Sequence, residues 1–222
     1  SRQVDGIIAV PCGDDPSLFE EINRKFIPVI LIDRYFSNSM LPYITTNNYL
    51  GGIDAANLLI MKGHSNIACI QGVVNSLPNK KRVAGYLAAL DKAGIKDKAL
   101  VVGNDFSIQN GYLETKLLLN KTDRPTAIFA LSNTIMLGAF RAIREAGLKI
   151  PEDISLVAFD NNIYMDYMTP AITRIGQRTE EMGKLATKLL FECISSGERS
   201  TTQIELSPTL ITGASVGTPT SQ

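Results

Sequence analysis

The chain has 222 residues, 45% of them hydrophobic and 20% charged, a composition that can bury one large core or two smaller ones. Lys plus Arg and Asp plus Glu both number 22, so no excess of positive charge attracts a phosphate backbone or an anionic membrane. We therefore expect neither nucleic-acid nor membrane binding by this segment.

Three cysteines, Cys12, Cys69 and Cys193, are far apart and lie in or beside apolar segments. This pattern indicates small buried residues in a reducing compartment and not a disulfide framework, so we expect a cytoplasmic protein. The start Ser1-Arg2-Gln3 has the character of neither a signal peptide nor an initiator methionine. We expect it to lie inside a longer chain.

Short apolar, β-branched runs recur along the chain and predict buried strands. They are Val4–Val10, Pro28–Ile32, Ile67–Ile70, Leu100–Val102, Ala127–Leu131 and Ile154–Phe159. Helical spacing fills the segments between them. Asp15 before Pro16 predicts a helix start, and Gly63, Gly94 and Gly147 predict helix ends.

Three helices carry apolar stripes that predict packing on a sheet. The stripes are Val83, Leu87 and Leu90; Ile135, Ala139 and Ile143; and Met182, Ala186, Leu189 and Leu190, the last in a helix over Glu180–Ser195. Alternating strands and helices predict an α/β fold with doubly wound, mainly parallel sheets.

We expect two lobes, because residues 65–174 form a complete set of such units whereas the first 46 residues do not. The predicted division is 1–46 as part of an incomplete N-terminal lobe, 47–176 as the C-terminal lobe, 177–207 as a return to the first lobe, and 208–222 as a final strand with a flexible tail. The Gly-, Ser-, Thr- and Pro-rich segment after Gly213 is the expected tail.

The markers of common enzyme classes are missing from the sequence. His64 is the only histidine, so a two-histidine metal site is excluded, and an exposed or helix-capping role is expected for it. Phosphate-binding, nucleophile-elbow and dinucleotide-binding glycine motifs do not occur. We expect no metal, no cofactor and no catalytic residues.

Polar side chains follow four successive predicted strands. They are Gln71, Asn75 and Ser76; Asn104 and Asp105, with the aromatic Phe106; Ser132 and Asn133; and Asp160, Asn161 and Asn162. Loops after parallel strands converge at one edge of the sheet, where ligands bind in such folds. Amides, hydroxyls and one aromatic ring are typical of a sugar or polyol site.

Asp160 and Arg82 are the charged candidates for this site, as acceptor and planar donor for ligand hydroxyls. Alternatives remain open for each: Asp160 as a helix N-cap, Arg82 in a surface ion pair, and Phe106 in the core. Their shared place at one sheet edge favours binding.

The sequence also resembles the ligand-binding core of the lactose-repressor/galactose-repressor family. The matching segments are Val4–Ile8, Gly63–Ala68 with Gly72, Arg82–Tyr86, Pro125–Ile128, Leu137–Ala139, Pro151–Ser155, Phe159–Asp160, Thr173 with Gln177, and Met182–Gly183. Their order and spacing cover nearly the whole chain.

The resemblance implies a periplasmic-binding-protein-like fold, with two lobes that close on an effector and with chain crossings near Asn47, Gln177 and Pro208. It implies a homodimer that binds operator DNA through a helix-turn-helix headpiece, which this segment does not contain.

By the same resemblance, Arg82 matches the arginine that contacts the effector, Asp160 a strand-end aspartate, Phe106 the aromatic that flanks the ligand, and Gln177 a hinge glutamine. We expect all four to bind the ligand. The expected ligand set is completed by Ser132-Asn133, Asn47 and Ser76. In the family, Asn-Asp is usual at the position of Ser132-Asn133, and Asp is common at the position of Asn47. Gly213-Ala214 departs from an arginine usual near the end.

Two other functions compete with a repressor's effector domain. One is a periplasmic sugar-binding transport receptor of the same fold, and the other is a sugar-modifying enzyme using Asp33 or Asp160. The cluster Tyr164, Met165, Tyr167 and Met168 faces either a second subunit or its own lobe.

Overall fold

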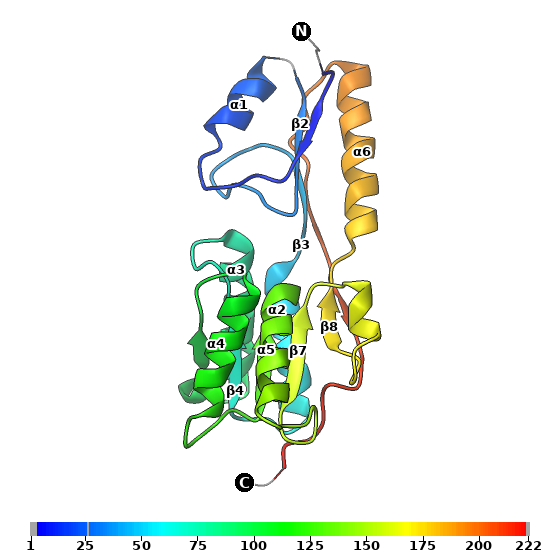
Figure 1. Cartoon of the computed structure of the whole chain (residues 1–222). Coiled ribbons are helices and arrows are strands. Elements are labelled where there is room, and N and C mark those ends of the chain that lie inside the picture. The colour runs from blue at the N-terminus through cyan, green and yellow to red at the C-terminus, as the bar shows by residue number, and fades with distance from the viewer. Residues whose placement is uncertain (1–3, 26, 221–222) are drawn as a thin grey trace. The chain divides into compact units, whose positions relative to one another are not determined.

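The computed structural model describes residues 4–25 and 27–220 (Figure 1). The chain forms two compact units. Unit 1 comprises the residues up to Asn47 together with Arg178–Ser207, and unit 2 comprises Asn48–Gln177 together with the residues from Pro208 onward.

Unit 1 is a parallel four-stranded sheet with a helix on each face. The strands run in the order β1 (Ile7–Ala9), β2 (Val29–Ile32), β3 (Tyr43–Thr46) and β9 (Gln203–Leu206). The helix α6 (Thr179–Ser196) packs Met182 and Ala186 against Ile30 and Ile44, and α1 (Ser17–Arg24) covers the other face. The apolar stripe predicted for the late helix is therefore confirmed.

Unit 2 is built on a six-stranded sheet in the order β10-β8-β7-β6-β4-β5, with β10 antiparallel to β8 and the other pairs parallel. Its strands are β4 (Ile67–Ile70), β5 (Leu100–Val102), β6 (Ala127–Ala130), β7 (Ser155–Phe159), β8 (Thr173–Gly176) and β10 (Thr209–Ile211). Its helices are α2 (Asn48–Met61), α3 (Leu77–Lys92), α4 (Ile108–Leu119) and α5 (Asn133–Glu145), with the 3-10 turns η1 (Lys96–Lys98) and η2 (Ile163–Asp166).

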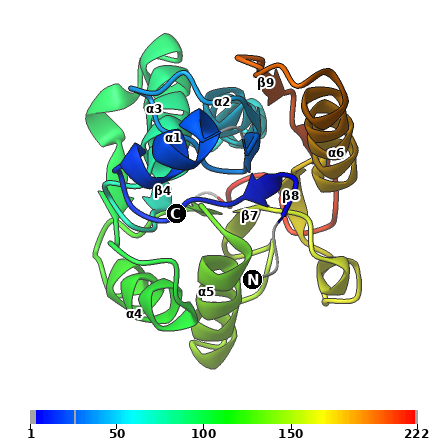
Figure 2. The same cartoon turned by 90° about the horizontal axis from the view of Figure 1, so that it is seen from above.

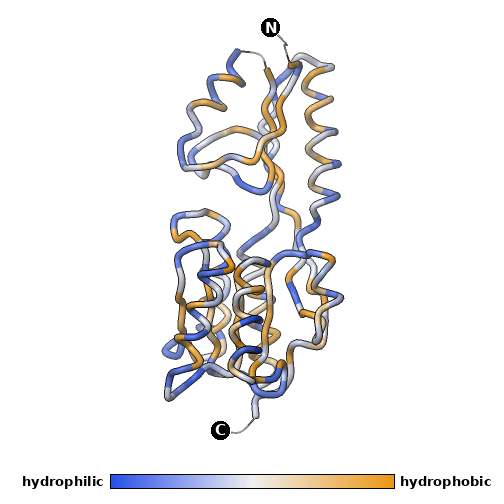
Figure 3. Tube along the Cα trace, in the orientation of Figure 1, coloured by the Kyte–Doolittle hydropathy of each residue, from blue (hydrophilic) through white to orange (hydrophobic). Residues whose placement is uncertain are grey.

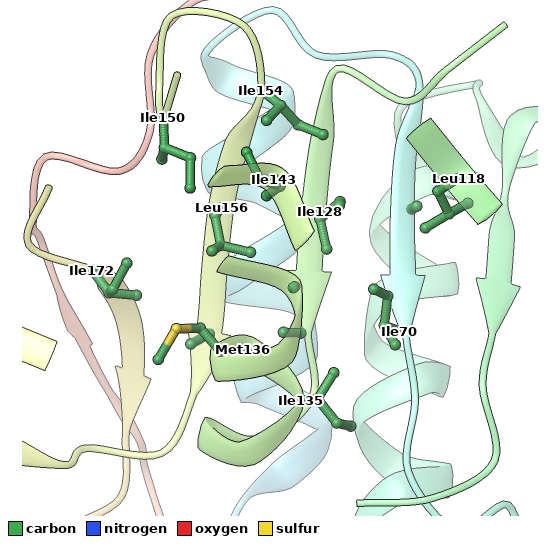
Figure 4. Packing of buried hydrophobic residues seen from close by; sticks show 14 of the residues in the cluster. Ile70, Leu118, Ile128, Ile135, Met136, Ile143, Ile150, Ile154, Leu156 and Ile172 are labelled. Atoms are coloured by element: carbon green, nitrogen blue, oxygen red, sulfur yellow. The ribbon is translucent and has the colours of Figure 1, made fainter. Parts of the chain in front are cut away.

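The central strands of unit 2 are buried on both faces, which explains their unbroken apolar runs. Ala68 and Ile70 of β4 point to the side of α4 and α5, whereas Ile67 and Cys69 point to the side of α2 and α3. Figure 2 shows the two helix pairs on opposite sides of this sheet, and Figure 4 shows the isoleucine-rich layer beneath α5. In Figure 3, hydrophobic and hydrophilic colours alternate along α5, which covers the sheet with one apolar face. The predicted α/β class is confirmed.

Each helix pair crosses at two glycines that allow close backbone approach. A Cβ at Gly138 of α5 would lie 2.0 Å from Ile108 O, and one at Gly111 of α4 would lie 2.1 Å from Ile135 O. At the other pair, a Cβ at Gly85 of α3 would lie 2.1 Å from Tyr49 O. The helices therefore pack at distances that no larger residue permits at these positions.

The six predicted strands all form, with ends that differ by a few residues. Asp15 accepts a hydrogen bond from Ser17 N at 2.9 Å, and helix α1 starts at Ser17. Gly63, Gly94 and Gly147 adopt positive φ angles of 94°, 72° and 73° after their helices, which confirms them as helix ends.

The segment after Gly213 was expected to be flexible, and this prediction was wrong for residues 213–217. Ser215 is fully buried; its Oγ donates to Leu156 O and accepts from Thr173 N at 2.9 Å. Gly217 N donates to Ser155 Oγ at 3.0 Å. The composition suggested disorder, but the backbone and Ser215 satisfy polar groups along β7 and β8.

His64 was expected to be exposed or capping, which was also wrong, because only 3% of it is exposed. Its Nδ1 lies 2.8 Å from Thr126 Oγ1, and its Nε2 lies 3.0 Å from Ser155 Oγ and 3.1 Å from Gly217 O. Burial lowers the pKa of His64, and the hydrogen bond to Gly217 opposes that shift. His64 thus ties the start of β4 to the C-terminal segment.

Cys69 and Cys193 are buried as predicted, whereas Cys12 is exposed; the prediction was wrong there, because Cys12 begins an open loop. Within residues 4–25 and 27–220, no helix has the length and apolar character needed to cross a bilayer.

Candidate functional site

The carboxyl ends of β4, β5, β6 and β7 meet at one edge of the unit 2 sheet, because these strands are parallel. Most of the residues predicted to bind a ligand lie on the segments that follow these strands or on the helices that start there. We describe them from Asp160 outward.

Asp160 follows β7 directly and has a φ of +81°, a left-handed conformation that costs a non-glycine residue about 1–3 kcal/mol. Its amide donates to Ile175 O at 2.9 Å. One carboxylate oxygen accepts from Gln177 Nε2 at 2.7 Å, and the other accepts from Asn133 N at 3.3 Å. The carboxylate is thus held by strand β8 on one side and by the start of α5 on the other.

Arg82 is not a surface residue, because only 5% of it is exposed. Its Nε donates to Asn48 Oδ1 and its Nη1 donates to Leu131 O, both at 2.7 Å. The guanidinium carbon lies 3.6 Å from the centre of the Phe159 ring. The cation is therefore fixed by neutral oxygens and by a ring face.

Phe106 is half-buried beside Gly72 at the ends of β5 and β4. A Cβ at Gly72 would lie 2.2 Å from the Phe106 ring, so the ring packs directly on the backbone there. Phe106 O accepts a hydrogen bond from Thr134 Oγ1 of α5, and Gly72 N donates to Asn79 Oδ1 at 2.8 Å.

Ser132 and Ser76 precede helices α5 and α3. Ser132 caps α5 by accepting from Ile135 N at 3.2 Å, and its Oγ lies 2.9 Å from Thr134 Oγ1. The helical turn that follows Asp160, η2, has Asn162 at its N-cap, so Asp160 is not the N-cap residue there. Ser76 Oγ is buried and has no hydrogen-bond partner within the part of the chain that the structure describes.

Five of the predicted residues, Arg82, Phe106, Ser132, Asp160 and Gln177, are linked by contacts through the start of α5. Ser76 lies six residues before Arg82, at the N-cap of the same helix, and outside this chain of contacts. Asn47 belongs to unit 1, where its amide donates to Leu206 O at 2.8 Å.

Sequence reasoning missed three amides that hold the loops of this edge. Asn48 binds Arg82. Asn79 donates to Gln71 Oε1 at 3.0 Å, and Asn110 donates to Gln71 O at 3.0 Å and to Asp105 O at 2.5 Å. The usable signal was an asparagine in the first turn of each helix that follows a strand end.

The two charged candidates at this edge are Arg82 and Asp160. Arg82 is buried, and Asp160 also contributes to raising the pKa of Tyr164, after the larger effect of burial. No cluster of three or more His, Cys, Asp or Glu able to hold a metal ion occurs among the described residues. The arrangement suits hydrogen bonding to a small polar molecule.

Comparison with known proteins gives the family. The profile of the family described as periplasmic binding protein-like domain matches residues 56–216. The ribose operon repressor of Haemophilus influenzae is 32% identical over 216 residues, and the PurR repressor of Erwinia tasmaniensis is 35% identical over 222 residues; each alignment covers 97% of this chain. The chain belongs to the lactose-repressor/galactose-repressor (LacI/GalR) family.

Solved structures of LacI family regulators have the same fold. One from Enterococcus faecium, solved with bound ribose, has a TM-score of 0.88 and 30% identity over 98% of this chain and 81% of that chain. A second, from Enterococcus faecalis and also with bound ribose, has a TM-score of 0.89 and 26% identity over 99% and 80%.

This LacI/GalR chain spans only part of its curated relatives. It covers 65% of the Haemophilus influenzae repressor and 64% of the Erwinia tasmaniensis protein. The activities of those whole proteins do not pass to this chain without further argument.

Proposed function

We propose that this chain is the effector-sensing part of a cytoplasmic transcriptional repressor and has no catalytic role. The effector is a sugar or a related small polar molecule, including nucleosides. The observation that carries the proposal is the linked set Arg82, Phe106, Ser132, Asp160 and Gln177 at one sheet edge. Parallel sheets bind ligands at such an edge.

The polar chemistry of the set supports this class of effector. Asp160 supplies an anionic acceptor, Ser132 a hydroxyl and Gln177 an amide, while Phe106 supplies an aromatic ring that follows β5. Ligand hydroxyls pair with acceptors and donors of this kind, and a sugar ring packs on an aromatic face. The ribose bound in two related regulators agrees with this class.

The effector would act by population shift. It binds one arrangement of the two units more tightly than another, and this difference changes the DNA affinity of the intact protein. Operator DNA would be bound through a helix-turn-helix headpiece outside the present sequence, and Asn47 and Ser76 would join the ligand contacts. The relatives include proteins named ribose operon repressor and PurR, which favours a repressor over a periplasmic transport receptor.

We also propose that the intact protein is a homodimer, with η2 in the contact surface. Ile163 and Tyr167 are 73% and 80% exposed, whereas Met165 is buried in the core of unit 2 and Tyr164 and Met168 pack partly against it. The cluster therefore divides between core and surface. Sedimentation of the intact protein tests this, and a monomer at all concentrations would overturn it.

A ligand screen tests the central proposal. A molecule that binds only the folded chain raises its unfolding temperature, so we expect D-ribose, another sugar or a nucleoside to do so. Asp160→Asn keeps a residue that tolerates the left-handed conformation and removes the charge. We expect about 10-fold to 100-fold weaker binding in calorimetry, as for one hydrogen bond to a charged group.

Asp91→Asn is the matched control, because Asp91 is exposed on α3 and pairs with the exposed Lys96. It should leave affinity unchanged. If no sugar or nucleoside shifts the unfolding temperature, effector sensing of this class is ruled out. If the intact protein binds no DNA fragment from its own promoter, with or without sugar, the transport receptor becomes the better assignment.

A further inference from the structure

Arg174 is a second buried cation in unit 2. It lies in the middle of β8, between β7 and β10, and its side chain is 4% exposed. Ile175 beside it points into the core under α2 and α3, so Arg174 points to the opposite face, since side chains alternate along a strand. A buried charge is costly unless it is fully paired.

The partners of Arg174 lie mainly on the segment that follows Asp160. Its Nε donates to Asn161 Oδ1 at 2.8 Å, its Nη1 donates to Ile172 O at 3.0 Å, and its Nη2 lies 2.8 Å from Asp166 Oδ1. Asn161 is the residue after Asp160, and Asp166 ends η2. One guanidinium therefore fixes both ends of the segment 161–166 on strand β8.

The same strand also holds the Asp160 carboxylate. Gln177, directly after β8, donates to Asp160 Oδ1, and Ile175 O accepts from the Asp160 amide. The backbone at Asp160 is in the left-handed region, which is kept only where the surroundings fix it. Arg174 supplies such a restraint immediately after the strained residue.

We propose that Arg174 is a positioning residue for Asp160: by binding Asn161 and Asp166, it keeps the turn after β7 in the geometry that presents the Asp160 carboxylate to the effector. The inference rests on the proposed function and extends it to a residue that does not itself contact the effector. Because the Asp166 side chain is 54% exposed, its ion pair with Arg174 contributes little net stability, and we expect the effect of Arg174 to fall mainly on the placement of Asp160.

The test uses the unliganded chain, so that it stands even if the effector proposal fails. Arg174→Met keeps the length and removes the charge, and Arg174→Lys keeps the charge with fewer donors. In NMR spectra, we expect Arg174→Met to shift the side-chain amide signals of Gln177 and the backbone amide signal of Asn133, the two donors to Asp160. Arg174→Lys should shift them less.

Ser215→Ala is the control for lost stability, because the Ser215 hydroxyl binds Leu156 O and Thr173 N in the same sheet, both outside the segment 161–166. It should lower the unfolding temperature without moving the two signals. Asp166→Asn removes the same ion pair from the side of Asp166, whose side chain is 54% exposed. This variant replaces Arg174→Met in the test if Arg174→Met does not fold.

Two results would overturn the proposal. One is that the folded Arg174 and Asp166 variants leave the Gln177 and Asn133 signals in place; the other is that Ser215→Ala moves them equally. Where D-ribose binds the parent chain, Arg174→Met should also weaken its binding about tenfold, as for one weakened hydrogen bond. If the Gln177 and Asn133 signals stay in place and no sugar binds the parent chain, both the positioning role of Arg174 and the proposed effector class are rejected. If the signals move but no sugar binds, only the effector class is rejected.

Discussion

The crossing of α4 and α5 gives a prediction whose sign depends on the structure. Gly138→Ala should destabilise the chain, although alanine is the better helix former. The new Cβ would lie 2.0 Å from Ile108 O and 2.5 Å from Tyr112 N. Both are backbone atoms of α4. Because backbone atoms cannot rotate away from the new Cβ as a side chain could, the two helices must separate.

The magnitude follows from two opposing effects. Alanine in place of glycine inside a helix gains about 1 kcal/mol of intrinsic propensity. Overpacking a closed core costs about 1–3 kcal/mol, and the backbone contact places this variant at the upper end. We therefore expect a net loss of about 2 kcal/mol in the free energy of unfolding.

Gly183→Ala on α6 is the matched control, because nothing lies within 4 Å of the Cβ that it adds. It should stabilise unit 1 by up to about 1 kcal/mol. Urea unfolding followed by circular dichroism measures both, since the chain has no tryptophan. The reasoning is refuted if Gly138→Ala is as stable as the parent chain or if the two variants shift in the same direction.

Three further changes have defined outcomes. The pKa of His64 is lowered by burial, so the unfolded chain takes up the proton first as the pH falls through about 6.5, and the stability of the folded chain decreases. His64→Gln should therefore reduce the difference between the urea midpoints measured at about pH 7.5 and about pH 5.5. An unchanged difference would contradict this. Arg82→Met should lower stability by about 1–3 kcal/mol in thermal unfolding, because Asn48 Oδ1 and Leu131 O lose a buried donor; a neutral result would mean that water replaces it. Gly72→Ala should displace the Phe106 ring and weaken sugar binding in calorimetry, and unchanged affinity would remove Phe106 from the site.

The central strands were predictable because burial on both faces leaves an apolar run, as in Ile67–Ile70 and Ala127–Ala130. Strands β8 and β10 were not found from periodicity. β8 contains the buried Arg174, and the three residues of β10 pair with it across a long sequence separation. The hydrophobic pattern of a short segment does not indicate which distant strand it pairs with.

The candidate site was predictable to the extent that parallel strands bring their following residues to one edge. Arg82 was found although it lies within a helix, because a planar donor near the start of the helix that follows a strand lies close to that edge. Asn48 and Asn110 were missed, because a helical asparagine reads as a surface residue until its backbone partners are known. His64 was misjudged for the same reason, since Ser155 and Gly217 are distant in sequence.

The place of β10 has a consequence for how the chain is made. During synthesis the residues after Pro208 leave the ribosome later than β7 and β8, yet Ser215 fills polar positions along these two strands. Until then, Thr173 N has no Ser215 acceptor and the edge of β8 stays open to other strands. A nascent chain of this protein therefore carries an unfinished sheet from the synthesis of β8 until the segment through Ser215 has emerged.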